Sequence, residues 1–376
     1  MKHHRVLHVI GGGEIGGAEK HVLSLLTGLG EYGYDPSLIC LCAGPFCDKA
    51  SGLGIKAATI EMHGKLDITK IAPMRAYMQN EKIDIVHTHG VRANLVARKA
   101  AKSLRLPVVT TFHSAVAHDY SSRIAALTAD FITRATNSNT DEFIAISEAI
   151  RKDVLKMNVA PEHVTTIYNG IDFNSKLLNA RQIWRQRFGV DDAAMVVGMV
   201  ARLHEVKGHI YLLEAMKILM GSFPDIRLVL VGDGPYKETV ETKIRELGIG
   251  NNVIMSGFIE NLLGVYDAFD VVCLPSLMEG MGITLLEAMH EGAPVVASKV
   301  GGIPELVRDG IDGILVTSAQ PAPLAAALQR VLCDKALSRK LIASAKQRAE
   351  LFSRTVMLQA TSALYDRLLE RDVRVE

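Results

Sequence analysis

The chain has 376 residues, of which 48% are hydrophobic and 22% are charged, and its net charge is +1. This length is large for a single hydrophobic core and fits two domains of about 150–200 residues, while the composition excludes a disordered or fibrous chain. No apolar run reaches the roughly 18 residues that a membrane-spanning helix needs, and no signal-peptide core is seen, so we expect a cytoplasmic protein or one attached to the inner face of a membrane.

The charge is divided unevenly along the chain. Residues 1–188 carry 23 Lys and Arg against 17 Asp and Glu, which gives +6, and the remaining residues carry 19 against 24, which gives −5. A helix expected from Val91 to Arg105 concentrates the positive charge and holds no acid; its cations are Arg92, Arg98, Lys99, Lys102 and Arg105. We expect these cations to face either an anionic membrane surface or water, while the apolar residues of the helix pack on a sheet.

The five cysteines show neither a disulfide framework nor a zinc pattern. An odd, scattered set indicates free thiols in a reducing compartment. Three of them are close in sequence but lack paired Cys-x-x-Cys knuckles, so no metal site is expected there. The cysteines are Cys40, Cys42, Cys47, Cys273 and Cys333.

A strand, a glycine-rich loop and a helix open the chain. Residues 5–10 predict a buried strand, and residues 19–29 predict an amphipathic helix. The loop between them contains Gly11-x-Gly13-x-x-Gly16, the fingerprint of dinucleotide sites, which also requires an acid at the end of the second strand. No acid follows the second expected strand, residues 37–42. A nicotinamide site is therefore not favoured.

Strand and helix patterns alternate as far as residue 168, which predicts a parallel sheet with helices on both faces. Ligands of such sheets bind beyond the carboxyl ends of the strands. The expected strands cover 83–87, 108–112, 143–146 and 164–168, and the expected helices cover 91–104, 124–136 and 148–157. The polar residues at strand ends are His87, His89, His113 and Ser147. Without carboxylates nearby, structural roles are favoured over metal binding for His87 and His89.

A second alternating region follows residue 172. Its first strand, residues 195–200, delivers Arg202 and, five residues later, Lys207. Two cations beside a cleft suit a diphosphate leaving group, whose developing charge they stabilise. The alternative is a pair of solvated charges at a strand end.

The stretch from Pro275 to Gly292 reads PSLMEGMGITLLEAMHEG. It predicts a loop that leads into a helix, whose N-terminal amides favour an anion. Two acids, Glu279 and Glu287, frame the loop, and carboxylates are good acceptors for sugar hydroxyls. The pattern fits a site for a sugar joined to a diphosphate, or, alternatively, an ordinary helix start with an acidic first turn.

Glu279-x7-Glu287 after Pro-Ser resembles the signature of glycosyltransferase family four, retaining enzymes of the GT-B fold. The resemblance implies that Glu279 contacts hydroxyls of the donor sugar and Glu287 holds the ribose. It implies that Arg202 and Lys207 bind the donor diphosphate, and that His113 lies near the donor sugar. The implied catalytic residues are His113, Arg202, Lys207 and Glu279.

The same resemblance implies further contacts with the donor, made largely by backbone groups. The first glycine loop reaches towards the phosphates and the acceptor, a segment after residue 253 faces the nucleobase, and the loop before the last signature helix supplies amides. These positions are Gly16, Gly17, Gly257, Phe258, Gly280, Met281, Gly282, Ile283 and Thr284. The chain lacks Asp-x-Asp, and we expect no metal ligands and no cofactor.

We therefore expect an α/β protein of the GT-B fold, with two Rossmann-like, doubly wound domains facing across a cleft. Residues 1–172, completed by a helix at 354–376, would form the acceptor side, and residues 173–353 the nucleotide-sugar side. The predicted activity is metal-independent, retaining transfer of a sugar from a UDP-sugar, or less typically a GDP-sugar, to an acceptor hydroxyl in glycan, polysaccharide or glycolipid biosynthesis. The acceptor is a glycan, a lipid-linked molecule or a small molecule, and no nucleic acid is involved. A nucleotide-sugar 2-epimerase and a non-catalytic synthase subunit are the alternatives.

Overall fold

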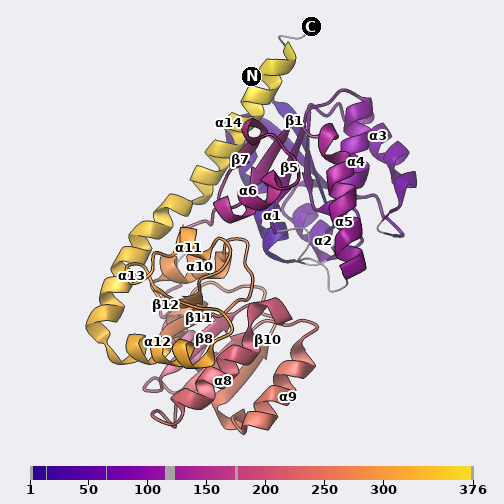
Figure 1. The fold of residues 1–376 in the computed structure, drawn as a ribbon. Helices are drawn as coiled ribbons and strands as arrows, with labels where there is room; N and C mark the ends of the chain where they lie inside the picture. The colour runs from indigo at the N-terminus through magenta and orange to yellow at the C-terminus, as the bar shows by residue number, and fades with distance from the viewer. Residues whose placement is uncertain (1–2, 14, 65, 115–122, 174–176, 374–376) are drawn as a thin grey trace. The chain divides into compact units, whose positions relative to one another are not determined.

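The computed structural model describes residues 3–13, 15–64, 66–114, 123–173 and 177–373. The chain forms two compact units (Figure 1). Unit 1 comprises Met1–Gly170 and Arg354–Glu376, and unit 2 comprises Ile171–Ser353.

Over the described residues, unit 1 is built on a seven-stranded parallel sheet in the order β3-β2-β1-β4-β5-β6-β7. The winding direction reverses between β1 and β4, which lie side by side at the centre of the sheet. The strands are β1 (His4–Ile10), β2 (Tyr34–Cys40), β3 (Lys56–Thr59), β4 (Ile85–His89), β5 (Val108–Phe112), β6 (Glu142–Ala145) and β7 (Val164–Thr166). The short, partly exposed strand β3 lacks a buried apolar run and was not among the expected strands.

Helices cover both faces of this sheet, as Figure 1 shows. One core joins alternate strand residues to α3 (Ile71–Asn80), α4 (Val91–Ser103) and α5 (Arg123–Thr136). The core on the opposite face joins the other strand residues to α1 (Gly17–Gly28) and α14 (Arg354–Val373). Further helices of unit 1 are α2 (Pro45–Gly52) and α6 (Glu148–Leu155).

The prediction that all five cations of the expected helix 91–105 face outward is wrong for Arg98 on α4, whose side chain is 0% exposed. Its guanidinium donates to Thr110 Oγ1 at 3.1 Å, to Thr136 Oγ1 at 3.0 Å and to Asn137 Oδ1 at 3.1 Å. The physical reason is that α5 packs against α4 and covers this flank. Because α4 contacts the sheet on one side and α3 and α5 on its flanks, only a narrow part of its surface is exposed to solvent.

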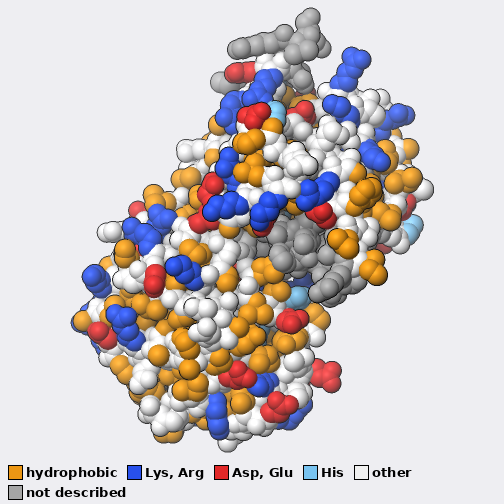
Figure 2. Space-filling view, in the orientation of Figure 1, with side chains coloured by type: hydrophobic (Ala, Val, Ile, Leu, Met, Phe, Trp, Pro, Cys, Tyr) orange, Lys and Arg blue, Asp and Glu red, His pale blue; other side chains and the backbone are white. Residues whose placement is uncertain are grey.

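A second cation of α4, Arg92, is half-buried, and its Nη1 lies 2.6 Å from Cys42 Sγ. Lys99, Lys102 and Arg105 are exposed. On the face drawn in Figure 2, Lys and Arg side chains are dispersed among acidic, apolar and uncharged ones. In the part of the chain that the structure describes, no helix is both long and apolar enough to cross a membrane.

Unit 2 repeats the same plan on a described six-stranded parallel sheet in the order β10-β9-β8-β11-β12-β13. Here the winding reverses between β8 and β11. The strands are β8 (Val196–Val200), β9 (Arg227–Val231), β10 (Val253–Gly257), β11 (Val271–Leu274), β12 (Val295–Ser298) and β13 (Ile314–Val316). The helices are α7 (Ala180–Phe188), α8 (His209–Leu219), α9 (Lys237–Leu247), α10 (Ile283–Glu291), α11 (Ile303–Leu306), α12 (Pro321–Cys333) and α13 (Lys335–Ala349). The predicted fold class, two doubly wound parallel α/β sheets, is confirmed.

A glycine fixes the distance between the loops that follow β8 and β11. Gly208 has φ +72°, and a Cβ at this position would lie 2.0 Å from the carbonyl oxygen of Pro275. Leu277 N also donates to Val206 O at 2.8 Å across the same two loops. The backbone approach therefore requires a residue without a side chain.

We expect Gly208→Ala to lower the stability of unit 2 well beyond the roughly 1–2 kcal/mol cost of placing a side chain in the left-handed region. The matched control is Gly248→Ala, because Gly248 has φ +63° and a Cβ added there would meet no atom within 4 Å. Denaturant unfolding and Tm would measure both variants. Equal losses in the two variants would show that the contact with Pro275 does not matter.

Candidate active site

In both units the candidate residues lie where the winding direction of the sheet reverses. At this point the loops from two adjacent strands lead to helices on opposite faces, which leaves a crevice beyond the strand ends. In unit 1 the crevice lies at the ends of β1 and β4, and in unit 2 at the ends of β8 and β11.

A cavity of about 260 Å³ occupies the crevice of unit 1. His113, the predicted active-site histidine, lines it together with His89, Glu19 and Asn94. Gly16 and Gly17 are exposed at the start of α1, where Gly16 N donates to Glu19 Oε2 at 3.0 Å. The first glycine loop thus ends next to a residue that lines the cavity.

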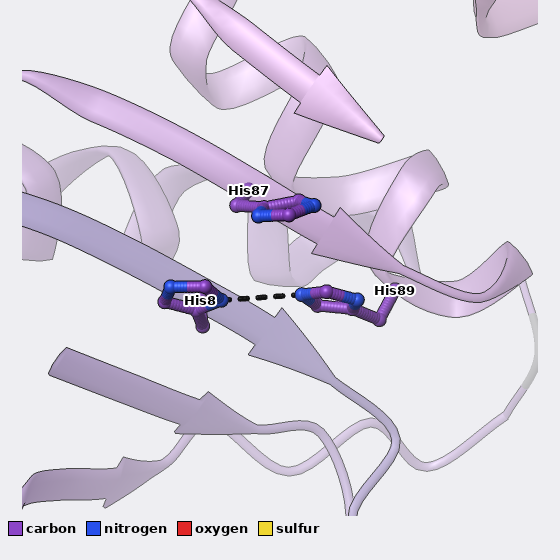
Figure 3. Close-up of side chains that lie close together, drawn as sticks. All are labelled: His8, His87 and His89. Carbon is purple, nitrogen blue, oxygen red and sulfur yellow. Dashed lines mark hydrogen bonds between the residues drawn. The ribbon is translucent and has the colours of Figure 1, made fainter. Parts of the chain in front are cut away.

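Histidines from the ends of β1, β4 and β5 are linked to one another at this cavity, and Figure 3 shows three of them, His8, His87 and His89. His8 Nδ1 lies 3.2 Å from His89 Nε2, and His89 Nδ1 lies 3.1 Å from His113 Nε2. His87 is placed by two other bonds, from Nδ1 to the Tyr365 hydroxyl at 2.6 Å and from Nε2 to Thr111 Oγ1 at 2.7 Å. Sequence reasoning had singled out His87, His89 and His113 but not His8.

His21, on α1, is the fifth histidine of this group and is buried, whereas His113 is half-buried. Its ring centroid lies 4.9 Å from that of His113 and 6.1 Å from that of His89. Burial lowers the pKa of His8 to about 3 and that of His21 to about 4, and it lowers the pKa values of the other three well below 6.5. Neighbouring histidines lower them further, except that of His21, so all five imidazoles are neutral at pH 7.

Strand alternation could have revealed His8. His8 pairs with His87 in the register of β1 and β4, and residues two apart on a strand face the same side. Once β1 and β4 are known to be neighbours, His8, His87 and His89 fall on one face. That adjacency is a property of the topology and is not visible in the sequence order.

The crevice of unit 2 holds the predicted cation pair and the first signature acid. Arg202 follows β8 and has an exposed side chain. Lys207 Nζ lies 2.6 Å from Glu279 Oε2, which also accepts from Ser276 Oγ at 3.2 Å. Lys207 is 24% exposed and Glu279 13%, so this ion pair is only partly accessible to water.

Two loops hold the backbone on either side of this ion pair. The predicted Gly-Asp-Gly-Pro loop, residues 232–235, supports the segment of Arg202, because Leu203 N donates to Asp233 O at 2.9 Å. Gly302 N donates to Glu279 O at 3.2 Å, and a Cβ on Gly301 would lie 1.8 Å from that same oxygen. The Gly301-Gly302 pair therefore lets the loop of Glu279 sit against the end of β12.

The second signature acid lies on α10. This helix begins at Ile283, and its N-cap, Gly282, has φ +88°. Thr284 and Ile283 are half-buried in the first turn, Gly280 is half-buried before it, and Met281 is 2% exposed.

Glu287 accepts from the Tyr266 hydroxyl at 2.6 Å, a partner that sequence reasoning missed because no motif marks Tyr266. Gly257 and Phe258 lie at the end of β10, and the Phe258 side chain is 64% exposed.

The comparisons with known proteins show the family of the chain. Residues 15–175 match the family model described as Glycosyltransferase Family 4, and residues 180–348 match the model described as Glycosyl transferases group 1. An uncharacterized glycosyltransferase of Methanocaldococcus jannaschii is 30% identical over 281 residues, which span 71% of this chain and 70% of that protein.

Two further relatives have more specific names. The UDP-Gal:alpha-D-GlcNAc-diphosphoundecaprenol alpha-1,3-galactosyltransferase of Escherichia coli is 27% identical over 316 residues, 81% of this chain and 82% of that enzyme. The crystal structure of Anabaena HepE in complex with UDP-glucose superposes with a TM-score of 0.86 at 25% identity, over 97% of this chain and 100% of that one.

The two doubly wound parallel sheets, taken together with these matches, show a glycosyltransferase of the GT-B fold. The chain belongs to glycosyltransferase family four, the retaining family that its signature motifs predicted.

Glu291, at the end of α10, holds the backbone of Tyr266, whose hydroxyl donates to Glu287. The pH dependence of protein stability tests whether Glu291 is buried there. Glu291 accepts from Gly264 N at 3.0 Å and from Tyr266 N at 3.1 Å, and burial raises its pKa from 4.5 to about 7. Because the folded pKa is the higher one, its stabilising contribution is present below about pH 4.5 and is lost as the pH rises to about 7.

We therefore expect the Tm of Glu291→Gln to rise relative to that of the native protein between pH 4.5 and pH 7, and the difference to stay constant above that range. Thermal unfolding across this pH range measures it. The same substitution at the exposed Glu246 controls for the loss of one carboxylate. A Tm difference independent of pH would contradict the burial of an ionisable Glu291.

Proposed function

We propose that this glycosyltransferase binds a UDP-sugar at the β8/β11 crevice of unit 2 and transfers the sugar to an acceptor hydroxyl with retention of configuration. The observation that carries the proposal is the 2.6 Å pair of Lys207 and Glu279, which places a cation and a sugar-hydroxyl acceptor at one point. UDP is supported by the names of the Escherichia coli and Anabaena relatives.

In this proposal Arg202, Lys207 and the N-terminus of α10 neutralise the diphosphate. Cations and oriented amides stabilise charge that develops on a leaving phosphate, and they act most strongly in a partly dry site. The α10 amides would come from residues 280–284, next to the left-handed Gly282. We expect no divalent cation to be needed at the diphosphate.

The two signature acids have separate tasks in the proposal. Glu279 accepts hydrogen bonds from the donor sugar, and Glu287, held by Tyr266, accepts them from the ribose. The backbone of Gly257 and Phe258 faces the nucleobase. His113, Gly16 and Gly17 belong to the acceptor side, near the sugar that is transferred. Because no carboxylate is positioned as a nucleophile in the proposal, the leaving phosphate takes the acceptor proton while the acceptor attacks from the same face.

The acceptor is a hydroxyl of a glycan, a lipid-linked molecule or a small molecule. Attachment to an anionic membrane at this helix rests on three exposed cations, Lys99 and Lys102 on α4 and Arg105 just after it. At about 1 kcal/mol for each cation, they give a weak and salt-dependent contact.

A thermal-shift panel of UDP- and GDP-sugars tests the donor, because a ligand that binds the folded state raises Tm by mass action. Nucleotide release with and without candidate acceptors then tests the reaction. A transferase releases UDP faster when its acceptor is present, a 2-epimerase needs no acceptor, and a non-catalytic subunit releases none. Absence of any Tm increase with UDP-sugars would contradict the proposed donor.

Lys207→Ala should lower turnover by about 10²–10³-fold, the scale for losing one preorganised charge contact. The control is Lys243→Ala, which breaks a 2.7 Å pair with Glu214 between α8 and α9 and removes a lysine that is also 24% exposed. Donor hydrolysis or transfer rates measure both. An equal loss of turnover in Lys207→Ala and Lys243→Ala would contradict the assignment of Lys207 to the active site.

Glu287→Ala should weaken the binding of free UDP by about 10–100-fold, the effect of losing a hydrogen bond to a charged group worth about 1.5–3 kcal/mol. Glu279→Ala should leave UDP affinity unchanged or higher, because it removes the counter-charge of Lys207, while it impairs discrimination between donor sugars. Calorimetric titration with UDP and rates with different UDP-sugars measure the split. Glu214→Ala is the control for Glu279→Ala. Equal loss of UDP affinity in both active-site variants would contradict the division of tasks.

A further inference from the structure

The buried histidines of unit 1 form two groups of three whose nitrogens lie within 4.8 Å of one another. One group is His8, His87 and His89, and the other is His21, His89 and His113. The proposed transfer reaction uses one of these five residues, His113, and gives no reason for the other four to be histidine.

In the first group His87 is held by hydrogen bonds at both ring nitrogens, while His8 Nε2 is buried without a partner among the described residues. Both ring nitrogens of His87 have partners, the Tyr365 hydroxyl and Thr111 Oγ1, at 2.6 and 2.7 Å. A ligand to this group would have to displace one of them. In the second group His89 Nδ1 and His113 Nε2 face each other at 3.1 Å, so an ion would replace only the proton that these two nitrogens share.

His21 is the most unusual member of the second group. It is 3% exposed, and neither Nδ1 nor Nε2 forms a hydrogen bond of standard geometry among the described residues, although the Asn169 side chain lies near enough to raise its pKa. His113 Nδ1 is likewise buried without a partner in the described part of the chain. Buried polar groups are nearly always satisfied, so the two unpartnered nitrogens of His21 indicate a missing partner.

The spacing of the second group matches three ligands on one ion. Nitrogens bound to a tetrahedral zinc at about 2.0–2.1 Å lie about 3.4 Å apart, and the ring centroids then lie about 5 Å apart. His89 Nδ1 and His113 Nε2 are 3.1 Å apart, and the three centroid separations are 4.9, 5.4 and 6.1 Å.

We propose that His21, His89 and His113 bind a zinc-class divalent cation at the β1/β4 crevice. His89 offers Nδ1 and His113 offers Nε2. Three protein ligands leave a fourth position open, as in catalytic zinc sites. His89 and His113 both line the 260 Å³ cavity, so that position is within reach of water or of a hydroxyl in the cavity.

The surroundings supply the partners that ligating histidines normally have. The other nitrogen of a ligating histidine usually donates to a neighbouring acceptor, and this fixes its tautomer. His89 Nε2 lies 3.2 Å from His8 Nδ1. Asn169 is 3% exposed with its Oδ1 unpartnered among the described residues, and its nearby side chain raises the pKa of His21 against the larger effect of burial.

The protonation state also suits a cation. Burial lowers the pKa of each of the three imidazoles, and a neutral imidazole is the form that binds metal. Imidazole ligands suit zinc, copper, iron and nickel. Zn²⁺ tests binding to the three imidazoles, and Co²⁺ can replace it where an absorption spectrum is needed.

The experiment uses the full chain, stripped with a chelator and then loaded with Zn²⁺ or Co²⁺. We expect one zinc per chain by elemental analysis, a zinc-dependent increase in Tm, and the absorption bands of four-coordinate Co²⁺. No stoichiometric zinc, or zinc that leaves Tm unchanged, would overturn the proposal and leave a cluster of neutral imidazoles held by hydrogen bonds alone.

Variants distinguish the two groups of histidines. His21→Ala and His113→Ala should each abolish stoichiometric binding, His8→Ala should weaken zinc about 10–100-fold through the loss of a supporting hydrogen bond, and His163→Ala, on the exposed surface, should have no effect. His113 is half-buried at the cavity, so its variant stays informative if His21→Ala folds poorly. Binding that survives His113→Ala but is lost in His87→Gln would overturn the assignment, because it would place the ion in the other group.

Discussion

Reversal of the winding direction is the constraint on which the rest of the molecule depends. Where β1 meets β4, and where β8 meets β11, consecutive loops turn to opposite faces of the sheet, and no connection crosses the strand ends between them. Polar groups at these two points therefore form hydrogen bonds and ion pairs with one another. In unit 1 the polar side chains are the histidines and Thr111, and in unit 2 they are Lys207, Ser276 and Glu279. Both sites are thus products of strand order.

The Lys207–Glu279 pair shows how such a site can exist before a ligand arrives. A partly buried charge without a partner is costly, and the two residues satisfy each other at 2.6 Å. Under the proposed function, the diphosphate of the donor would replace Glu279 as the partner of Lys207, and the sugar hydroxyls would replace Lys207 as the partner of Glu279. Neither Lys207 nor Glu279 would then be a buried charge without a partner, either before or after the donor binds.

Most of the fold could be predicted because its signals are local. Alternation of buried strands and amphipathic helices identified the parallel sheets, and the loops of Arg202, Lys207, Glu279 and Glu287 follow their strands in sequence. What failed depends on neighbours that are distant in sequence. The exposure of Arg98 was predicted wrongly because α5 covers its side of α4. His21 and Tyr266 were missed because no sequence motif indicates that they contact His113 and Glu287. The half-exposed strand β3 pairs with β2 without an apolar run of its own.

Unit 1 is formed by two segments that are separated in sequence by unit 2, and this affects how the chain folds during its synthesis. Its core includes Met357, Leu358, Leu364, Tyr365 and Leu368 from α14, and Tyr34 donates to Asp366 at 2.5 Å from the same helix. Unit 2, by contrast, is a single continuous segment. On a ribosome that releases the chain from its N-terminus, the later unit has all its strands before the earlier one receives its last helix. Until then the face of the first sheet that carries His8 and His87 is covered by α1 but lacks α14. The half that is synthesised first is therefore the half that must wait, with apolar surface exposed, for the last part of the chain to emerge.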